Sequence, residues 1–204
     1  MEIAKGIRNT DYQALDLSNP LNEDWLKTFG YFENRIKERY LEPVEILMDA
    51  EDKVSASAKK FGFTIMSIDC LLIEVLQSFR DGIKDSSGES GEIFRNFLTQ
   101  RNSFSGYFNT VEADYFYKKV RCNLLHQAQT SNDTKIWTVG EMIRRQNGIT
   151  TINRVKFHQA IVDEFEIYLK ELKGKKYKVL LENFRKKIGF YLLALKTFVR
   201  IVFR

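Results

Sequence analysis

The sequence predicts an all-α protein, and three observations lead to that class. Only two prolines and 11 glycines stand among the 204 residues, so few positions interrupt a helix. Apolar residues recur at intervals of three and four over several long segments, which is the period of an amphipathic helix. Hydrophobic residues make up 44% of the chain and charged residues 29%, values typical of soluble globular domains. This composition excludes collagen-like, low-complexity and wholly disordered proteins.

Residues 1–20 lack a sustained apolar period, so we expect a flexible lead-in to a single helical domain over 21–204. The first helix is expected over 22–40. Its apolar side chains lie three or four residues apart and form one stripe that should be core: Trp25, Phe29, Phe32, Ile36 and Tyr40. Pro43 lacks a backbone N–H and should end or break this helix.

A short helix over 44–50 and an exposed polar segment over 51–60 lead to the most apolar segment, residues 61–79. This segment is hydrophobic on nearly every side, which predicts the central helix of a bundle. It also carries two acids, Asp69 and Glu74. Because a buried carboxylate without a partner is unfavourable, each of these acids should have a basic partner.

The second half of the chain predicts further helices and one irregular insertion. A short helix is expected over 92–100, an irregular connection over 101–110 and a long helix over 111–129. Near 130–153 the pattern changes, and we expect a hairpin or an extended loop there. Helical periodicity returns over 155–172.

The net charge of +5 is unevenly distributed along the chain. Residues 173–204 carry ten Lys or Arg side chains and a single acid, Glu182, whereas the preceding residues sum to −4. A basic end on a mildly acidic body indicates a polyanionic partner, either nucleic acid or an anionic membrane. A solvated basic face explains the same composition equally well.

One or two terminal helices are expected over 179–203. The apolar stretch 188–203 is too short to cross a bilayer and is interrupted by lysine and arginine. Lys196, Arg200 and Arg204 fall four residues apart, on one stripe of a helix. This pattern favours a helix docked on the protein, with an in-plane membrane helix as the alternative, so a membrane partner is not the favoured expectation.

Two cysteines and two histidines are too few for a common zinc site without carboxylate ligands, and we expect neither a metal nor another cofactor. Cys70 and Cys122 form no Cys-x-x-Cys pattern and suit a reducing compartment. The N-terminus has no apolar core of signal-peptide length, so the expected location is the cytoplasm. His158 is expected to be structural.

The densest set of polar side chains lies on the helix predicted over 111–129. Its members are Tyr115, Tyr117, Arg121, Cys122, Asn123, His126 and Gln127. In a regular α-helix, Arg121 and His126 are about 140° apart around the axis, so they lie to either side of a groove and do not touch. A site that uses both therefore needs groups from elsewhere, and a second copy of the same helix is the simplest source.

Arg121 and His126 form the pattern Arg-x-x-x-x-His, which resembles the signature of HEPN domains, many of which are ribonucleases. The resemblance extends to the apolar helix LLIEVLQSFRDG before the motif, to a tryptophan-containing loop and to the helix FHQAIVDEFEIYLKELK after it. This order is similar to the Apea-like HEPN subgroup of prokaryotic anti-phage and toxin-like proteins. It covers about residues 25–190.

The resemblance implies an antiparallel helical bundle that pairs with a second copy and cleaves RNA at the dimer seam without a metal ion. It implies His126 as general acid or base and Arg121 as a phosphate clamp, roles that suit a titratable imidazole and a permanent cation. Asn123, Gln127 and Tyr117 would bind or orient the substrate. The expected partners are RNA, a second copy and an antitoxin or other regulatory protein.

Three alternatives remain at the level of sequence. Cys122 stands directly after the arginine, where catalytic HEPN motifs commonly have Asn, Asp or His, so a non-catalytic module that binds RNA or a protein is the second hypothesis. A pairing of Arg121 with Glu74 would satisfy a buried acid and also fix the guanidinium. Cys122 and His126 also have the spacing of a nucleophile and its base, but a mid-helix cysteine is typical of packing.

Overall fold

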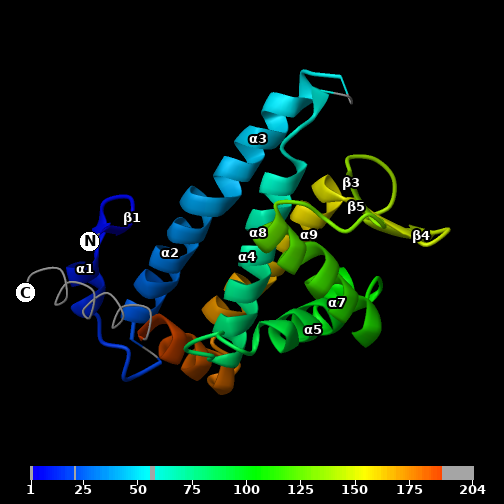
Figure 1. The fold of residues 1–204 in the computed structure, drawn as a ribbon. Helices are drawn as coiled ribbons and strands as arrows, with labels where there is room; N and C mark the ends of the chain where they lie inside the picture. Colours follow the sequence, from blue (N-terminus) through cyan, green and yellow to red (C-terminus); the bar gives the residue numbers. More distant parts are fainter. Residues whose placement is uncertain (1, 21, 56–57, 190–204) are drawn as a thin grey trace, which may run out of the picture. The chain divides into compact units, whose positions relative to one another are not determined.

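The computed structural model describes residues 2–20, 22–55 and 58–189, and most of them are helical (Figure 1). The helical class is confirmed, but a purely α description is wrong because the chain also forms a small three-stranded sheet. In chain order the elements are β1 (Glu2–Ala4), β2 (Ile7–Arg8), α1 (Asn9–Gln13), α2 (Asp24–Ile36), a π turn (Lys37–Leu41), α3 (Glu42–Asp52), α4 (Gly62–Asp81), α5 (Ser90–Gln100), α6 (Asn102–Ser105), α7 (Thr110–Phe116), a second π turn (Tyr117–Cys122), α8 (Asn123–Gln127), β3 (Thr134–Trp137), β4 (Ile143–Gln146), β5 (Ile149–Asn153) and α9 (Arg154–Gly174).

The chain packs as two compact units, whereas the sequence predicted one domain over 21–204. The unit that contains both termini is called the terminal unit. It consists of Met1–Arg39, Ser78–Ser87 and Ile167–Arg204. The other is called the central unit and consists of Tyr40–Gln77 and Gly88–Glu166. Both units are therefore built from segments that are separated in the sequence.

Aromatic side chains form the core of the terminal unit. Trp25, Phe29, Phe32 and Ile36 of α2 are buried, which confirms these members of the stripe predicted as core. Tyr40, the last member, lies in the π turn and is half-buried. The ring of Phe32 lies 4.6 Å from that of Phe79, and the ring of Phe29 lies 5.3 Å from that of Phe184. Three distant stretches of the chain therefore meet in one cluster of rings.

Specific contacts hold the first described residues of the terminal unit, within the stretch 1–20 expected as a lead-in. Strands β1 and β2 pair antiparallel, and the side chain of Ala4 between them is buried. The backbone N–H of Lys5 donates to Glu38 Oε2 at 2.9 Å, and Arg39 Nη2 donates to the Glu2 carbonyl at 3.0 Å. Backbone hydrogen bonds of this kind carry no periodic signal that the sequence would reveal.

The basic end of the chain is described as far as residue 189. Residues 178–189 are helical, which agrees with the start of the terminal helices expected over 179–203. The predicted stripe of Lys196, Arg200 and Arg204 lies outside the described residues.

Helix α4 and the phenylalanines packed around it form the core of the central unit. Ile65, Met66 and Leu72 of α4 are fully buried, as predicted for a central helix. The rings of Phe116 and Phe157 stack 5.2 Å apart and link α7 to α9. Among the described residues, α4 alone is long and apolar enough to span a membrane, and 56% of its most apolar window is buried inside the protein. A core helix has the same composition.

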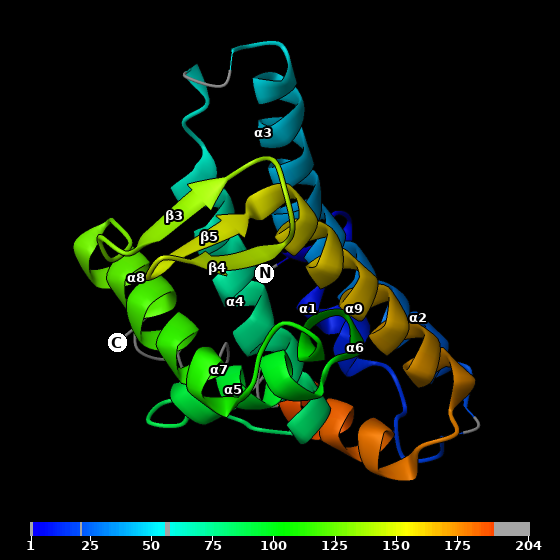
Figure 2. The same ribbon diagram turned by 90° about the vertical axis from the view of Figure 1, so that its right-hand side faces the viewer.

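The insertion near 130–153 folds as the three-stranded sheet, in the order β3-β5-β4 (Figure 2). A hairpin does form in this stretch, between β4 and β5, with Asn147 and Gly148 at φ values of 52° and 73° in the turn. Both values are positive, as a two-residue hairpin turn requires, and Asn-Gly adopts them readily. The hairpin considered from the sequence would have joined 135–140 to 148–157 instead. Strand β3 pairs parallel to β5, which the sequence did not predict.

Pro43 does not stop helix formation where the sequence predicted a break. It lies in the first turn of α3, directly after the π turn Lys37–Leu41. A backbone N–H in the first turn of a helix has no intrahelical acceptor, so proline removes no hydrogen bond there. The preceding π turn also changes the hydrogen-bond pattern locally.

Candidate active site

A fixed helix start positions the segment that carries the motif. Asn109 precedes α7, and its Oδ1 accepts from the backbone N–H of Glu112 at 3.0 Å. In return Glu112 Oε2 accepts from the backbone N–H of Asn109 at 2.8 Å. This reciprocal capping box satisfies two N–H groups that the helix leaves open and determines where α7 begins.

A π turn interrupts the predicted helix within the motif itself. Arg121 and Cys122 lie in the π turn Tyr117–Cys122, whereas Asn123, His126 and Gln127 lie in α8. A π turn has one more residue per hydrogen-bonded ring than an α-helix, so the 140° separation expected between Arg121 and His126 does not apply. Single π turns inside helices occur frequently at functional sites.

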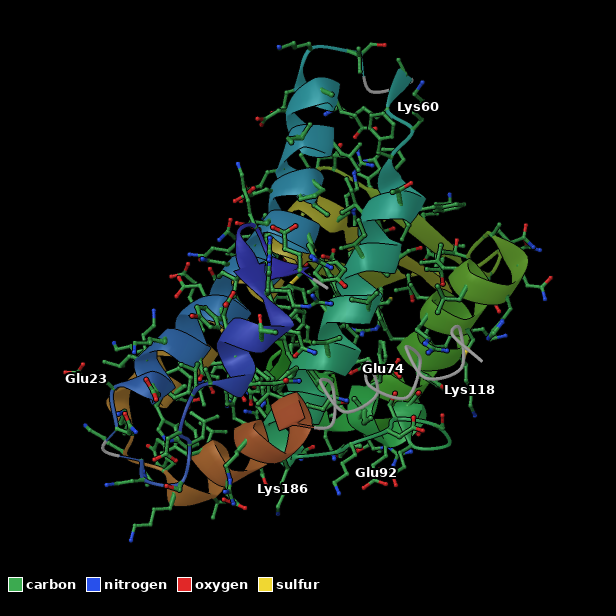
Figure 3. The ribbon with its side chains drawn as sticks, turned by 90° about the vertical axis from the view of Figure 1, so that its left-hand side faces the viewer. Glu23, Lys60, Glu74, Glu92, Lys118 and Lys186 are labelled. Atoms are coloured by element: carbon green, nitrogen blue, oxygen red, sulfur yellow. The ribbon has the colours of Figure 1, made fainter. Side chains whose placement is uncertain are left out.

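The guanidinium of Arg121 is paired with Glu74 of α4. Arg121 Nη2 donates to Glu74 Oε2 at 2.9 Å, and both side chains are 17% exposed. Ser90, at the start of α5, donates its hydroxyl to the other Glu74 oxygen at 2.8 Å. Figure 3 shows Glu74 part of the way along α4. The carboxylate is therefore held from two sides and fixes the arginine at the edge of the core.

The environment keeps the Arg121 guanidinium charged. Burial opposes its charge, but the hydrogen bond and the charge of Glu74 outweigh burial and raise the pKa of Arg121. A permanent planar cation at the edge of a protein suits the binding of a phosphate group.

Tyr117 packs beside this arginine. The Arg121 guanidinium carbon lies 5.5 Å from the centroid of the Tyr117 ring, and the Phe94 ring lies 5.4 Å from it. A Cβ on Gly91 would lie 3.4 Å from the same ring, so the absence of a side chain there gives the tyrosine room. Burial, followed by the influence of Cys122, raises the pKa of Tyr117. The phenol therefore stays protonated and can donate a hydrogen bond.

His126 and Gln127 are exposed near the end of α8, unlike Arg121. The helix ends at Ala128, which adopts a left-handed conformation with φ of 54°. In the described part of the chain, the His126 imidazole takes part in no hydrogen bond or ion pair. It is therefore accessible to water and to a ligand. Asn123, one turn earlier, is half-buried.

A second acid of α4, Asp69, has a different basic partner. His158 Nδ1 lies 2.7 Å from Asp69 Oδ1, and the two side chains are 2% and 0% exposed. The structural role expected for His158 is confirmed by this burial. The pair is closed to solvent and is not a candidate for catalysis.

The cysteines do not form a nucleophilic site. Cys70 is fully buried, and burial raises the pKa of its thiol well above the usual range. Cys122 is half-buried at the end of the π turn, where the backbone stays helical into α8, so it does not lie at a free helix N-terminus. Within residues 2–20, 22–55 and 58–189, no group of three or more His, Cys, Asp or Glu side chains could hold a metal ion.

The structure thus brings together some of the predicted site residues and leaves others at the surface. Arg121, Glu74 and Tyr117 are in contact, and Ser90 joins them although sequence reasoning missed it. A serine that follows a glycine-rich loop gives no signal that would distinguish it from a turn residue. His126 and Gln127 are displayed to solvent.

No family model, curated protein or solved structure matches this chain.

Proposed function

We propose that this protein is a metal-independent endoribonuclease of HEPN type that cleaves RNA at a site formed by two copies of the chain. One observation carries the proposal. Glu74 holds the Arg121 guanidinium in place, while His126 on the same helical segment is exposed and unpaired. A fixed cation and a free imidazole are the two groups that metal-free RNA cleavage needs.

The chemistry follows from these two groups. The 2′-hydroxyl loses a proton and attacks the adjacent phosphorus, the bond to the 5′-oxygen breaks, and that oxygen gains a proton. His126 of one copy serves as base or acid, since imidazole titrates near neutrality. Arg121 stabilises the negative charge that develops on the phosphorus oxygens. Asn123, Gln127 and Tyr117 orient the nucleotide, and the products are a 2′,3′-cyclic phosphate and a 5′-hydroxyl.

Two apolar side chains beside the site support a paired arrangement. Leu125, next to His126, is 51% exposed, and Leu71, one turn before Glu74 on α4, is 41% exposed. Covering these side chains with a second copy would bury apolar surface and bring a second imidazole to the same cleft. The basic segment from Lys173 onward would attract the RNA backbone.

The motif resemblance also supports a biological setting, which we propose on that basis alone. The enzyme would act in the cytoplasm of a prokaryote, in anti-phage defence or as the toxin of a toxin–antitoxin pair. An antitoxin or another regulatory protein would then restrain it.

The test is cleavage of mixed RNAs in EDTA by the full chain and by His126→Ala. We expect the variant to be about 10²–10⁴-fold slower, the range for loss of a general acid or base. Gln129→Ala, an exposed neighbour, is the matched control and should cleave at the wild-type rate. Intact RNA after incubation with the wild type, or equal cleavage by the variant, refutes the nuclease. RNA binding without cleavage would then favour the non-catalytic module.

A further inference from the structure

A pocket with basic and apolar side chains in its lining lies at the start of α4 in the central unit. It has a volume of about 430 Å³. Its lining includes the basic residues Lys59, Lys60 and Arg154, the first residue of α4, Gly62, and Trp137 at the end of β3. Figure 3 shows Lys60 just before α4 begins. None of the described residues that line it is acidic.

The three cations of this pocket differ in how they are held. Lys60 is exposed, and Lys59 is half-buried with its Nζ 3.7 Å from Asp52 Oδ1. The Arg154 side chain is 4% exposed, and its Nη2 donates to the buried Glu51 carboxylate. Arg154 Nε is buried and has no hydrogen-bond partner among the described residues. A buried cationic donor without a partner on the wall of a pocket is a reason to expect an anionic or polar ligand there.

The start of α4 borders the pocket. Glu51 Oε1 accepts from the backbone N–H groups of Lys60 and Phe61 at 2.6 and 2.7 Å, so this buried carboxylate fixes the segment before the helix and offsets part of its positive end. The glycine at position 62 allows a close approach, because a Cβ there would lie 3.1 Å from Arg154 Nη1. The positive end of the helix dipole at Gly62 favours an anion, with phosphate as the usual case.

Trp137 supplies an aromatic face beside these cations. It is 52% exposed, which is unusual for the largest apolar side chain, and the neighbouring Val139 is 63% exposed. Nucleic-acid-binding proteins use exposed aromatic rings as platforms on which bases stack. The other tryptophan, Trp25, is 2% exposed.

We propose that this pocket binds one nucleotide unit, with its base on Trp137 and its phosphate against Lys60, Lys59 and the start of α4. The nucleotide can belong to single-stranded RNA or be a free mononucleotide. Along α4 the pocket is about 18 Å from Glu74, at the helical rise of 1.5 Å per residue. It is therefore separate from the Arg121 and His126 site, and nucleotide binding there does not depend on the proposed cleavage.

The direct test is quenching of Trp137 fluorescence in the full chain. The probes are AMP, adenosine, inorganic phosphate and a short single-stranded RNA, the last with His126→Ala so that the RNA stays intact. We expect AMP or the RNA to quench, and adenosine and phosphate alone to bind at least about 10-fold more weakly, since each makes part of the contacts. Quenching should vanish in Trp137→Phe, because Trp25 is buried.

The second test uses RNA anisotropy and matched variants. Trp137→Ala should weaken binding by about 5- to 150-fold, the effect of losing one stacked base, whereas Trp137→Phe should retain most of it. Lys60→Ala should lower the salt dependence by about one counterion. Tyr177→Ala and Lys170→Ala alter an exposed aromatic and an exposed lysine outside the pocket, and should bind as the wild type does.

The outcomes separate the two sources and the two proposals. Quenching by RNA alone assigns the pocket to the RNA strand, and quenching by AMP alone assigns it to a free nucleotide. No quenching by either ligand, wild-type binding by Trp137→Ala, or equal affinity for phosphate and AMP overturns the nucleotide pocket. Quenching in a protein that cleaves no RNA overturns the proposed nuclease and leaves the pocket standing.

Discussion

Two acids of α4 form pairs with basic residues, and the two pairs differ in burial and therefore in the role that each can have. Asp69 and Glu74 lie five residues apart on α4, and each has a basic partner from a distant part of the sequence. The Asp69–His158 pair is closed to solvent, at 0% and 2% exposure. The Glu74–Arg121 pair retains 17% exposure on each side chain and lies beside the exposed end of the motif segment.

The buried pair therefore serves stability, whereas the edge pair is available for chemistry. A ligand cannot reach a sealed imidazole, but it can reach a guanidinium that is partly exposed. His126, the exposed histidine, completes the contrast with His158.

Breaking the sealed pair should have the largest effect. His158→Ala leaves Asp69 buried and unpaired, so we expect the free energy of unfolding to fall by about 3–5 kcal/mol. Urea denaturation measures this loss. His126→Ala, at the exposed histidine, should change the same quantity by no more than about 0.5 kcal/mol. Equal losses of the free energy of unfolding in the two variants would show that the buried and the exposed histidine contribute alike to stability.

Breaking the edge pair should affect activity more than stability. Glu74→Gln removes the charge that holds Arg121 but keeps the shape of the side chain. We expect kcat for RNA cleavage to fall by about 10²-fold, as when a catalytic group is misplaced by about 1 Å.

The free energy of unfolding of Glu74→Gln should fall by about 1–2 kcal/mol. Glu89→Gln, on an exposed side chain, is the control for both measurements. Full activity in Glu74→Gln would show that this pair is structural as well.

The sealed pair should also make stability depend on pH. Burial raises the pKa of Asp69, and its hydrogen bond to His158 only partly opposes this rise. The folded state therefore holds this proton more tightly than the unfolded state, and the stabilisation is complete below the unfolded pKa of about 3.9.

As pH rises through the folded pKa of Asp69, that stabilisation is lost. The free energy of unfolding of the wild type should therefore decline relative to Asp69→Asn from about pH 4 upward, by at most about 1.4 kcal/mol per pH unit. Denaturation at a series of pH values gives the slope. A difference that stays constant with pH would contradict the assignment.

The smallest effect is expected at an exposed pair in the terminal unit. Lys173 Nζ lies 2.7 Å from Glu33 Oε2, but the lysine side chain is 47% exposed. Lys173→Ala should lower the free energy of unfolding by about 0.2–1 kcal/mol, and high salt should abolish the difference from the wild type. If Lys173→Ala lowered the free energy of unfolding as much as His158→Ala, burial would not explain the order of these effects.

The helices were largely predictable because their signal is local. The apolar segments over 61–79 and 155–172 correspond to α4 and α9. They could be predicted because apolar residues three and four positions apart lie on one face of a helix. The insertion near 130–153 was expected as a hairpin or an extended loop because the pattern changes there, but β4 was not recognised as a strand. The parallel pairing of β3 with β5 could not be predicted. Strand β4 lies between them in the sequence, and pairing between strands that are not consecutive leaves no local signature.

The site was predictable in its residue types and only partly in its contacts. The Glu74–Arg121 pair could be anticipated because a buried acid needs a partner, but the sequence did not show that Asp69 would take His158 instead. The π turn has no sequence signature of its own. Lys59 and Lys60 were expected to be merely exposed, since their position beside Trp137 arises only when the sheet forms.

The discontinuity of the terminal unit has a consequence for the order in which a ribosome delivers its parts. Helix α2 is synthesised before the central unit, yet the rings that cover Phe29 and Phe32 include Phe184, which is synthesised after it. The last residue of the central unit is Glu166. A nascent chain therefore displays the aromatic face of α2 to chaperones and proteases until Phe184 has emerged from the ribosome.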